Sequence, residues 1–223
     1  MSAPIATSHR ATDWDRYYQS VPATARLTRQ YTTAMLVGAI RRYAQAPAGQ
    51  PLAMVEIGGA NSCFVDRLVA EFAPRSYDVV DTNQFGLDLL ARHAAAGGSL
   101  GQTLRLHRES VLAMSLPPVA DVVFSVGLVE HFSPADTRAA VLAHFNAVRT
   151  GGLAIITFPT PTGLYRATRR FLESIGQWKF HDERPLLPPE VLQSVRERGE
   201  LLFEKTLWPL MLTQHLVVAR KLR

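Results

Sequence analysis

The sequence contains a single cysteine, Cys63, among its 223 residues. One thiol cannot form an internal disulfide, and it cannot build a multi-cysteine zinc site. No run reaches the roughly 18 apolar residues that a membrane-spanning helix needs. The first 18 residues, MSAPIATSHRATDWDRYY, lack the apolar stretch of a signal peptide. These absences predict a soluble cytoplasmic protein that makes no use of a membrane.

A strong excess of charge is also missing. Lysine and arginine number 24 against 19 acidic residues, which gives a formal net charge of +5. The basic residues are spread along the chain, so we interpret them as solvated surface and not as a nucleic-acid footprint. The Asn-Pro-Pro-Tyr type of motif that accompanies base methylation is absent too. A nucleic-acid partner is therefore not expected.

What the sequence does contain is a regular alternation of apolar strands and amphipathic helices. Strands are predicted at 52–58, 76–81, 103–109, 120–127 and 153–159, and helices at 61–72, 83–98 and 133–152. Continuous apolar strands separated by helices indicate a parallel sheet covered on both faces. The last segment, 201–221, offers two more strands that would end the sheet with a hairpin. We predict an α/β fold with a doubly wound, mostly parallel, seven-stranded sheet.

The predicted single domain divides into four parts. Residues 1–48 form an N-terminal helical lid with a helix over 24–46, and residues 49–160 form the ligand-binding core. Residues 161–190, rich in arginine and aromatic side chains with a helix at 163–174, form a cap inserted after the fifth strand. Residues 191–223 supply the end of a helix over 188–199 and the hairpin strands. Ligands bind at the carboxyl ends of strands in such sheets, so we expect the cap to lie there.

A glycine turn follows the first strand in MVEIGGANSCF, residues 54–64. A dinucleotide-binding turn needs G-x-G-x-x-G, but the three positions here hold Gly58, Ala60 and Cys63. Glu56 would also face the phosphates of such a ligand. The Walker pattern fails because no Lys-Ser or Lys-Thr follows the turn. These features disfavour NAD, FAD and nucleoside triphosphates.

A ligand with an adenosine, no phosphate and a positive charge fits the turn better. S-adenosylmethionine has these properties, and Glu56 can help to bind its ammonium end through water or the turn backbone. The amides at the start of the next helix remain for its carboxylate. Asp81 ends the second strand, where a carboxylate can bind both ribose hydroxyls. The alternative role of Asp81 is as N-cap of the following helix.

Four pieces of sequence together resemble the S-adenosylmethionine-dependent methyltransferases with a Rossmann-like (class I) fold. They are VEIGGANS, VVD, DVVFSVGLVEHF and RTGGLAIITFP, and the resemblance covers about residues 50–160. Ala60 and Ser62 stand where the family commonly has glycine. The resemblance implies S-adenosyl-L-methionine as the cofactor and a cofactor site made of Tyr17, Tyr18, Glu56, Gly58, Gly59, Ala60, Ser62, Asp81, Thr82, Glu109, Ser110 and Val126. Whether Glu109 or Ser110 lies on the adenine side is left open.

Methyl transfer mainly requires alignment, and a general base helps when the acceptor is a hydroxyl or a protonated nitrogen. His131, which follows the fourth strand next to Glu130, and His181 in the cap are the candidates. Their alternative roles are a structural histidine and a surface histidine. Tyr17 and Tyr18 either close over the cofactor or pack as a helix pair. The spacing of His181, Asp182 and Glu183 does not suit a metal, and none is predicted.

Three functions are compatible with these patterns. The first is transfer of a methyl group to an oxygen or nitrogen of a small molecule. The second is a non-catalytic subunit with the methyltransferase fold, and the third, least favoured, is a nucleic-acid methyltransferase. The chain is expected to be a monomer or a homodimer.

Overall fold

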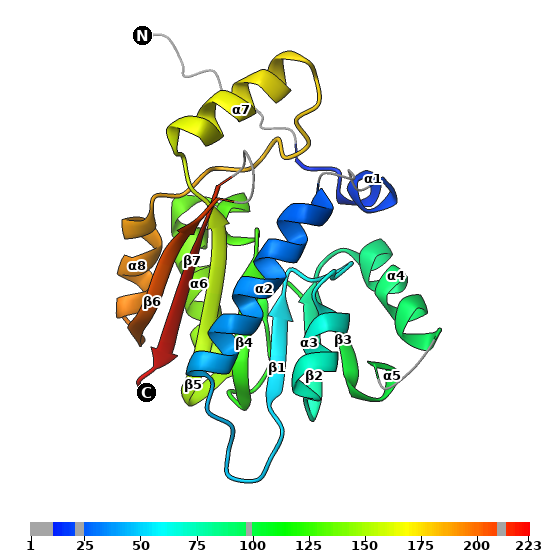
Figure 1. Cartoon of the computed structure of the whole chain (residues 1–223), viewed down its shortest axis with the longest axis vertical. Coiled ribbons are helices and arrows are strands. Elements are labelled where there is room, and N and C mark those ends of the chain that lie inside the picture. Colours follow the sequence, from blue (N-terminus) through cyan, green and yellow to red (C-terminus); the bar gives the residue numbers. More distant parts are fainter. Residues whose placement is uncertain (1–10, 21–24, 97–99, 209–212) are drawn as a thin grey trace.

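A seven-stranded sheet forms the centre of the computed structural model, which describes residues 11–20, 25–96, 100–208 and 213–223 (Figure 1). The strand order is β3-β2-β1-β4-β5-β7-β6. The first five strands pair in parallel, and β7 runs antiparallel to both β5 and β6. The strands are β1 (Ala53–Ile57), β2 (Ser76–Asp81), β3 (Leu104–Arg108), β4 (Ala120–Val126), β5 (Val148–Pro159), β6 (Gly199–Leu207) and β7 (Gln214–Lys221). The predicted doubly wound, mostly parallel sheet is confirmed.

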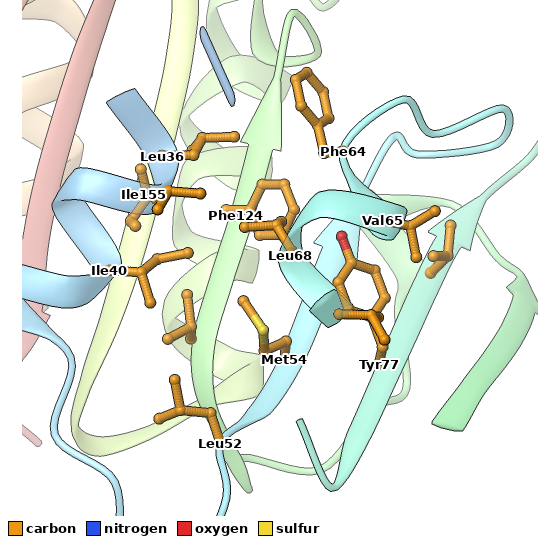
Figure 2. Close-up of a cluster of buried hydrophobic side chains, with 14 of the residues drawn as sticks. Leu36, Ile40, Leu52, Met54, Phe64, Val65, Leu68, Tyr77, Phe124 and Ile155 are labelled. Atoms are coloured by element: carbon orange, nitrogen blue, oxygen red, sulfur yellow. The ribbon is translucent and has the colours of Figure 1, made fainter. Parts of the chain in front are cut away.

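Helices cover both faces of the sheet, which has a hydrophobic cluster on each side. Leu36 and Ile40 of α2 and Leu68 of α3 pack on one face around Met54 and Phe124 (Figure 2). On the other face α6 and α8 pack against the strands. The helices are α1 (Trp14–Gln19), α2 (Ala25–Tyr43), α3 (Val65–Phe72), α4 (Gln84–Ala95), α5 (Leu100–Thr103), α6 (Pro134–Ala147), α7 (Gly163–Ser174) and α8 (Pro188–Arg196), with 3-10 turns η1 (Val111–Ala113) and η2 (Val129–His131).

The largest differences from the predicted element boundaries lie in two places. The helix expected over 61–72 begins only at Val65, because the preceding residues form the turn that follows β1. The helix expected over 133–152 ends at Ala147, and β5 begins at once with Val148, which pairs with Ala120. Gly151 has a φ of 78°, which no helix accommodates. Residues 1–10 of the predicted N-terminal lid, the start of its predicted helix at 24 and the hairpin tip at 209–212 lie outside the described residues.

Two segments distant in sequence meet above the carboxyl ends of the parallel strands. The segment around α1 lies there beside the chain that follows α7 (Figure 1). The Thr12 hydroxyl donates a hydrogen bond to Asp182, which follows α7. The Asp15 carboxylate accepts a hydrogen bond from the Asn83 side chain at the start of α4, at 2.6 Å. These contacts place the N-terminal helix over the edge of the sheet where parallel α/β folds bind ligands.

Asp121 joins three segments at the opposite end of the sheet. Its side chain is buried and accepts hydrogen bonds from the Ala53 amide at 2.8 Å, Arg75 Nη1 at 2.9 Å and Arg149 Nε at 2.6 Å. We expect Asp121→Ala to lower the free energy of unfolding by about 2–4 kcal/mol, because it leaves a buried amide and two guanidinium groups without their acceptor. Urea denaturation of the two proteins measures the difference.

Glu197→Ala is the matched control, since Glu197 pairs with Arg138 on the surface. An exposed ion pair contributes little, so this variant should unfold close to the wild-type midpoint. Equal losses in the two variants would show that Asp121 does not hold the three segments together.

Candidate functional site

The turn after β1 requires glycine at its first position. Gly58 has a φ of 77°, which disfavours any other residue. A Cβ atom built on Gly58 would lie 3.0 Å from a methyl carbon of Leu128, in the turn that follows β4. The Gly58 amide donates to the Val80 carbonyl at 2.8 Å. The turn is therefore held between the ends of β2 and β4, and the Leu128 side chain packs closely against its backbone.

Glu56 points inward below this turn, with only 3% of its surface exposed. Its carboxyl accepts a hydrogen bond from the Tyr77 hydroxyl at 2.6 Å. Ser62 Oγ lies 2.9 and 2.7 Å from the two carboxyl oxygens. A Cβ atom on Gly59 would come within 2.6 Å of Glu56 Cδ, so the turn closes directly over the carboxyl group. Burial raises the pKa of Glu56 to about 7, although its two hydroxyl partners oppose this shift.

Ser62 connects this carboxyl group to the start of α3. Its Oγ accepts hydrogen bonds from the amides of Phe64 and Val65, at 3.1 and 3.2 Å. The sequence marked Ser62 only as a departure from glycine, whereas its hydroxyl supplies the acceptor that the helix start needs. Two of the amides expected to face a ligand carboxylate are thus already hydrogen-bonded within the chain.

Asp81 lies at the end of β2 and faces the same turn. Its Oδ2 accepts from the Ala60 amide at 3.0 Å, and its Oδ1 accepts from the Asn83 amide at 2.8 Å. Burial raises the pKa of Asp81, while these amides oppose the shift. The N-cap of α4 is Asn83, whose side chain accepts from the Gly86 amide at 2.6 Å. Asp81 is therefore not the N-cap, and Thr82 next to it is exposed.

Both adenine-side candidates have local hydrogen bonds. The Glu109 carboxylate accepts from the Ser115 amide at 2.8 Å and from the Ser115 hydroxyl, and these bonds lower its pKa. Ser110 Oγ accepts from the Leu112 amide at 3.2 Å and caps η1. The Glu109 amide donates to the Asp81 carbonyl, so this loop adjoins the end of β2. Val126, half-buried at the end of β4, completes the predicted set.

Five aromatic side chains roof this edge of the sheet, and we call them the aromatic lid: Trp14, Tyr17, Tyr18, Trp178 and Phe180. The Trp14 ring lies 6.0 Å from Phe180, and the Tyr17 ring lies 5.2 Å from Phe180. Trp178 continues the cluster at 5.8 Å from Phe180. The predicted N-terminal and cap segments therefore do meet over the carboxyl ends of the strands.

Tyr18 covers the glycine turn itself. A Cβ atom on Gly86 would lie 2.7 Å from both the Tyr18 ring and the Ala60 methyl group. Burial, and after it the Asp81 charge, raise the pKa of Tyr18 well above its ordinary value. Tyr17 lies on the outer side, where its hydroxyl is 3.4 Å from Arg29 Nη2. The two rings also contact each other, with centroids 5.9 Å apart, so both belong to the aromatic lid.

Arg29 was not anticipated from the sequence. Its guanidinium group, from α2, lies 3.4 Å from the Tyr17 hydroxyl, and its charge opposes the rise of the Tyr18 pKa beside the glycine turn. A positive group at this place complements a ligand carboxylate. Only its position in the folded chain reveals it, since one arginine in an amphipathic helix is unremarkable in sequence.

His131 lies under the aromatic lid, with its ring 5.2 Å from that of Trp14. Its Nδ1 is 3.0 Å from Asp182 Oδ1, and Asp182 also accepts from the Thr12 hydroxyl. Burial lowers the pKa of His131, with Asp182 opposing, and hydrogen bonds lower the pKa of Asp182 against burial. A carboxylate partner fixes the proton on Nδ1 and leaves the lone pair of Nε2 available.

His181, the second candidate base, has an exposed side chain. The neighbouring Asp182 is the residue that contacts His131. Glu183, next again, accepts a hydrogen bond from the Tyr165 hydroxyl, and burial raises its pKa to about 7. Sequence reasoning considered Asp182 and Glu183 only as part of an unsuitable metal site, and it missed the roles of these two acids.

Glu130 precedes the histidine and is 2% exposed. Its Oε1 lies 4.0 Å from His131 Nε2, and its Oε2 has no hydrogen-bond partner among the described residues. Burial, then the charges of Glu183 and Asp182, raise its pKa well above the ordinary range. The site thus combines a neutral imidazole with a buried, unsatisfied carboxyl group.

The sequence matches no protein-family profile and no curated protein. Solved structures do match. The magnesium protoporphyrin IX methyltransferase ChlM of Synechocystis PCC 6803, solved with bound S-adenosylhomocysteine, superposes with a TM-score of 0.73 at 12% identity, over 93% of this chain and 92% of that one. The chain has the fold of the class I methyltransferases.

Two further structures indicate the breadth of this fold. The N-methyltransferase NodS of Bradyrhizobium japonicum WM9, in complex with S-adenosylhomocysteine, gives a TM-score of 0.65 at 12% identity, over 93% of this chain and 92% of that one. The [4+2]-cyclase SpnF gives 0.64 at 12% identity, over 84% and 81%. At such identities the methyltransferase fold is what is shared, and the chemistry must be argued from the site.

Two features are absent from the described ranges. In them no helix is long and apolar enough to cross a membrane. The same ranges hold no cluster of three or more histidine, cysteine, aspartate or glutamate side chains suited to a metal ion.

The raised pKa of Glu56 predicts a pH dependence of stability. Between about pH 4.5 and 7 the native protein keeps a proton that the unfolded chain has lost, so the contribution of Glu56 to stability decreases as pH rises through this window. Glu56→Gln cannot titrate. We expect the difference in free energy of unfolding, variant minus wild type, to increase by about 1–3 kcal/mol from pH 5 to pH 7.5, because only the wild-type protein loses stability from Glu56.

Urea denaturation at several pH values measures this difference. Glu183 and Asp81, whose pKa values are also raised, are present in both proteins and cancel. Parallel stability curves for the two proteins would show that Glu56 is ionised in the native state.

Proposed function

We propose that this chain is an S-adenosylmethionine-dependent methyltransferase that acts on an oxygen or nitrogen of a small molecule. One observation carries the proposal: the glycine turn with Asp81 lies under the same aromatic lid that covers the His131–Asp182 pair. A cofactor subsite and a candidate base thus adjoin at the edge of the sheet. In this proposal residues 49–160 bind the cofactor, 1–48 and 161–190 enclose the acceptor, and 191–223 complete the sheet.

The residues of the turn fit this cofactor. The Asp81 carboxyl would hold the ribose hydroxyls, and the backbone from Gly58 to Ala60 allows close approach. Glu109 or Ser110 would lie on the adenine side, and Arg29 with the lid tyrosines would lie near the methionine carboxylate. Glu56 would act indirectly, by holding the turn through Ser62. When bound, the cofactor supplies a methyl group on a sulfonium, whose leaving group is neutral.

The chain's own work would then be to orient the acceptor, exclude water and accept a proton. The aromatic lid supplies apolar walls that keep water out. Asp182 holds the His131 ring so that Nε2 faces the acceptor, and burial keeps the imidazole neutral. These features favour His131 over His181 as the general base, with in-line alignment of the acceptor as the larger effect.

A second candidate is a non-catalytic subunit with the same fold. The hydrogen bonds that Glu56 and the α3 amides make within the chain favour it, because they use groups expected to bind ligand. Calorimetric titration with S-adenosylhomocysteine separates the two candidates. Absence of binding to the folded protein would support the non-catalytic subunit.

Asp81→Ala tests the cofactor site. We expect it to weaken S-adenosylhomocysteine binding by about 1.5–3 kcal/mol, the scale of hydrogen bonds to a charged group. Calorimetry on the purified variants gives the affinities. Asp88→Ala, on the exposed side of α4, is the control and should bind as the wild type does. Wild-type affinity in folded Asp81→Ala would remove Asp81 from the ribose role.

His131→Ala and His181→Ala test the base. With an acceptor that the wild-type protein methylates, His131→Ala should lower the single-turnover rate by about 10²–10⁴-fold while S-adenosylhomocysteine affinity stays near wild type. His181→Ala, whose side chain is exposed, should keep most of the rate. Near-full rates in both variants would mean that alignment alone accounts for catalysis and that neither histidine is a base.

A further inference from the structure

Glu130 is a buried acid whose hydrogen-bonding capacity is not used. Only 2% of its surface is exposed, and Oε2 has no partner within the described part of the chain. Leaving a buried polar group without a partner costs about 1–3 kcal/mol, and more for a charged group. A group of this kind needs an explanation such as a ligand. Its position beside His131 Nε2, at 4.0 Å, suggests that the ligand is the methyl acceptor.

Acidic side chains cluster at this site, and a bound cation would favour their ionised forms. Asp182 and Glu183 both lie close enough to Glu130 for their charges to affect its carboxyl group. Asp182 is hydrogen-bonded to Thr12 and His131. Glu183 accepts a hydrogen bond from Tyr165 and lies 3.8 Å from the Arg169 guanidinium group. Of the three acids, only Glu130 has a buried oxygen for which the described residues supply no hydrogen-bond partner.

The aromatic lid adds faces that attract cations. Trp14 lies against His131, and Phe180 lies 6.4 Å from the same ring. Aromatic faces bind ammonium groups with roughly 0.5–2 kcal/mol of stabilisation. The Arg169 guanidinium already uses the Trp178 ring in this way, at 4.9 Å. Trp14 and Phe180 are therefore the rings left beside Glu130 and His131 for a cationic ligand.

We propose that the acceptor is an amine on an apolar body, and that its ammonium group binds Glu130 beneath Trp14 and Phe180. The proposal rests on the methyltransferase function and narrows its substrate class from oxygen or nitrogen to nitrogen. An ammonium nitrogen has no lone pair, so it must lose a proton before it can accept a methyl group. His131 Nε2 takes that proton, and Asp182 stabilises the imidazolium that results. A carboxylate acceptor is disfavoured, because it would lie beside the acids Glu130, Asp182 and Glu183.

Three ligands with a phenyl group and different charge test the proposal: phenethylamine, 2-phenylethanol and phenylacetate. Each is titrated by NMR into the full-length protein saturated with S-adenosylhomocysteine. We expect phenethylamine to bind at least about tenfold more tightly than 2-phenylethanol, a ratio typical of a buried charge pair. Phenylacetate should bind most weakly of the three. Glu130→Gln should abolish the preference for the amine. Glu200→Gln, an exposed change on β6, is the control and should keep it.

The outcomes separate this inference from the proposed function. If S-adenosylhomocysteine does not bind, the methyltransferase function fails. If it binds and the alcohol or phenylacetate binds as tightly as the amine, or the amine does not bind at all, the amine proposal is overturned while the function stands. The relative affinities of the three ligands for the wild-type protein test the amine proposal even if Glu130→Gln does not fold. A preference that survives in folded Glu130→Gln would overturn the role of Glu130.

Discussion

One buried carboxyl group holds the ligand-binding edge of this protein in shape. Glu56 cannot reach water, so its oxygens are satisfied by the hydroxyls of Tyr77 and Ser62. Ser62 in turn fixes the start of α3, and the turn passes so close above Glu56 that Gly59 has no room for a side chain. Strand, turn and helix thus share one hydrogen-bonded group. The turn keeps its geometry with alanine and serine at positions where related folds commonly have glycine.

The upper half of the site depends on a different kind of contact. Thr12 and Asp182 are far apart in sequence, yet their hydrogen bond links the N-terminal segment to the cap and orients His131 between them. The base candidate is therefore positioned by tertiary structure and not by its own element, the short η2 turn. Since Trp14 of α1 packs on His131, we expect any change that moves α1 to shift this ring as well.

Much of the fold could be predicted because its signals are local and periodic. Apolar strands, the glycine turn and an acid at the end of the second strand follow from short stretches, and so do the places of Gly58 and Asp81. The roles of Ser62 and Asp182 could not be predicted. Ser62 was compared with a glycine pattern, which hides what a hydroxyl adds. The contact of Asp182 with His131 spans 51 residues and leaves no periodic trace.

The short helix α1 covers two places at once. Tyr18 packs over Ala60 and Gly86 at the glycine turn, and Trp14, one helical turn earlier, packs on His131. The six residues of α1 therefore cover both halves of the site. Displacement of α1 would expose the glycine turn and His131 together, so neither place can change its cover without the other.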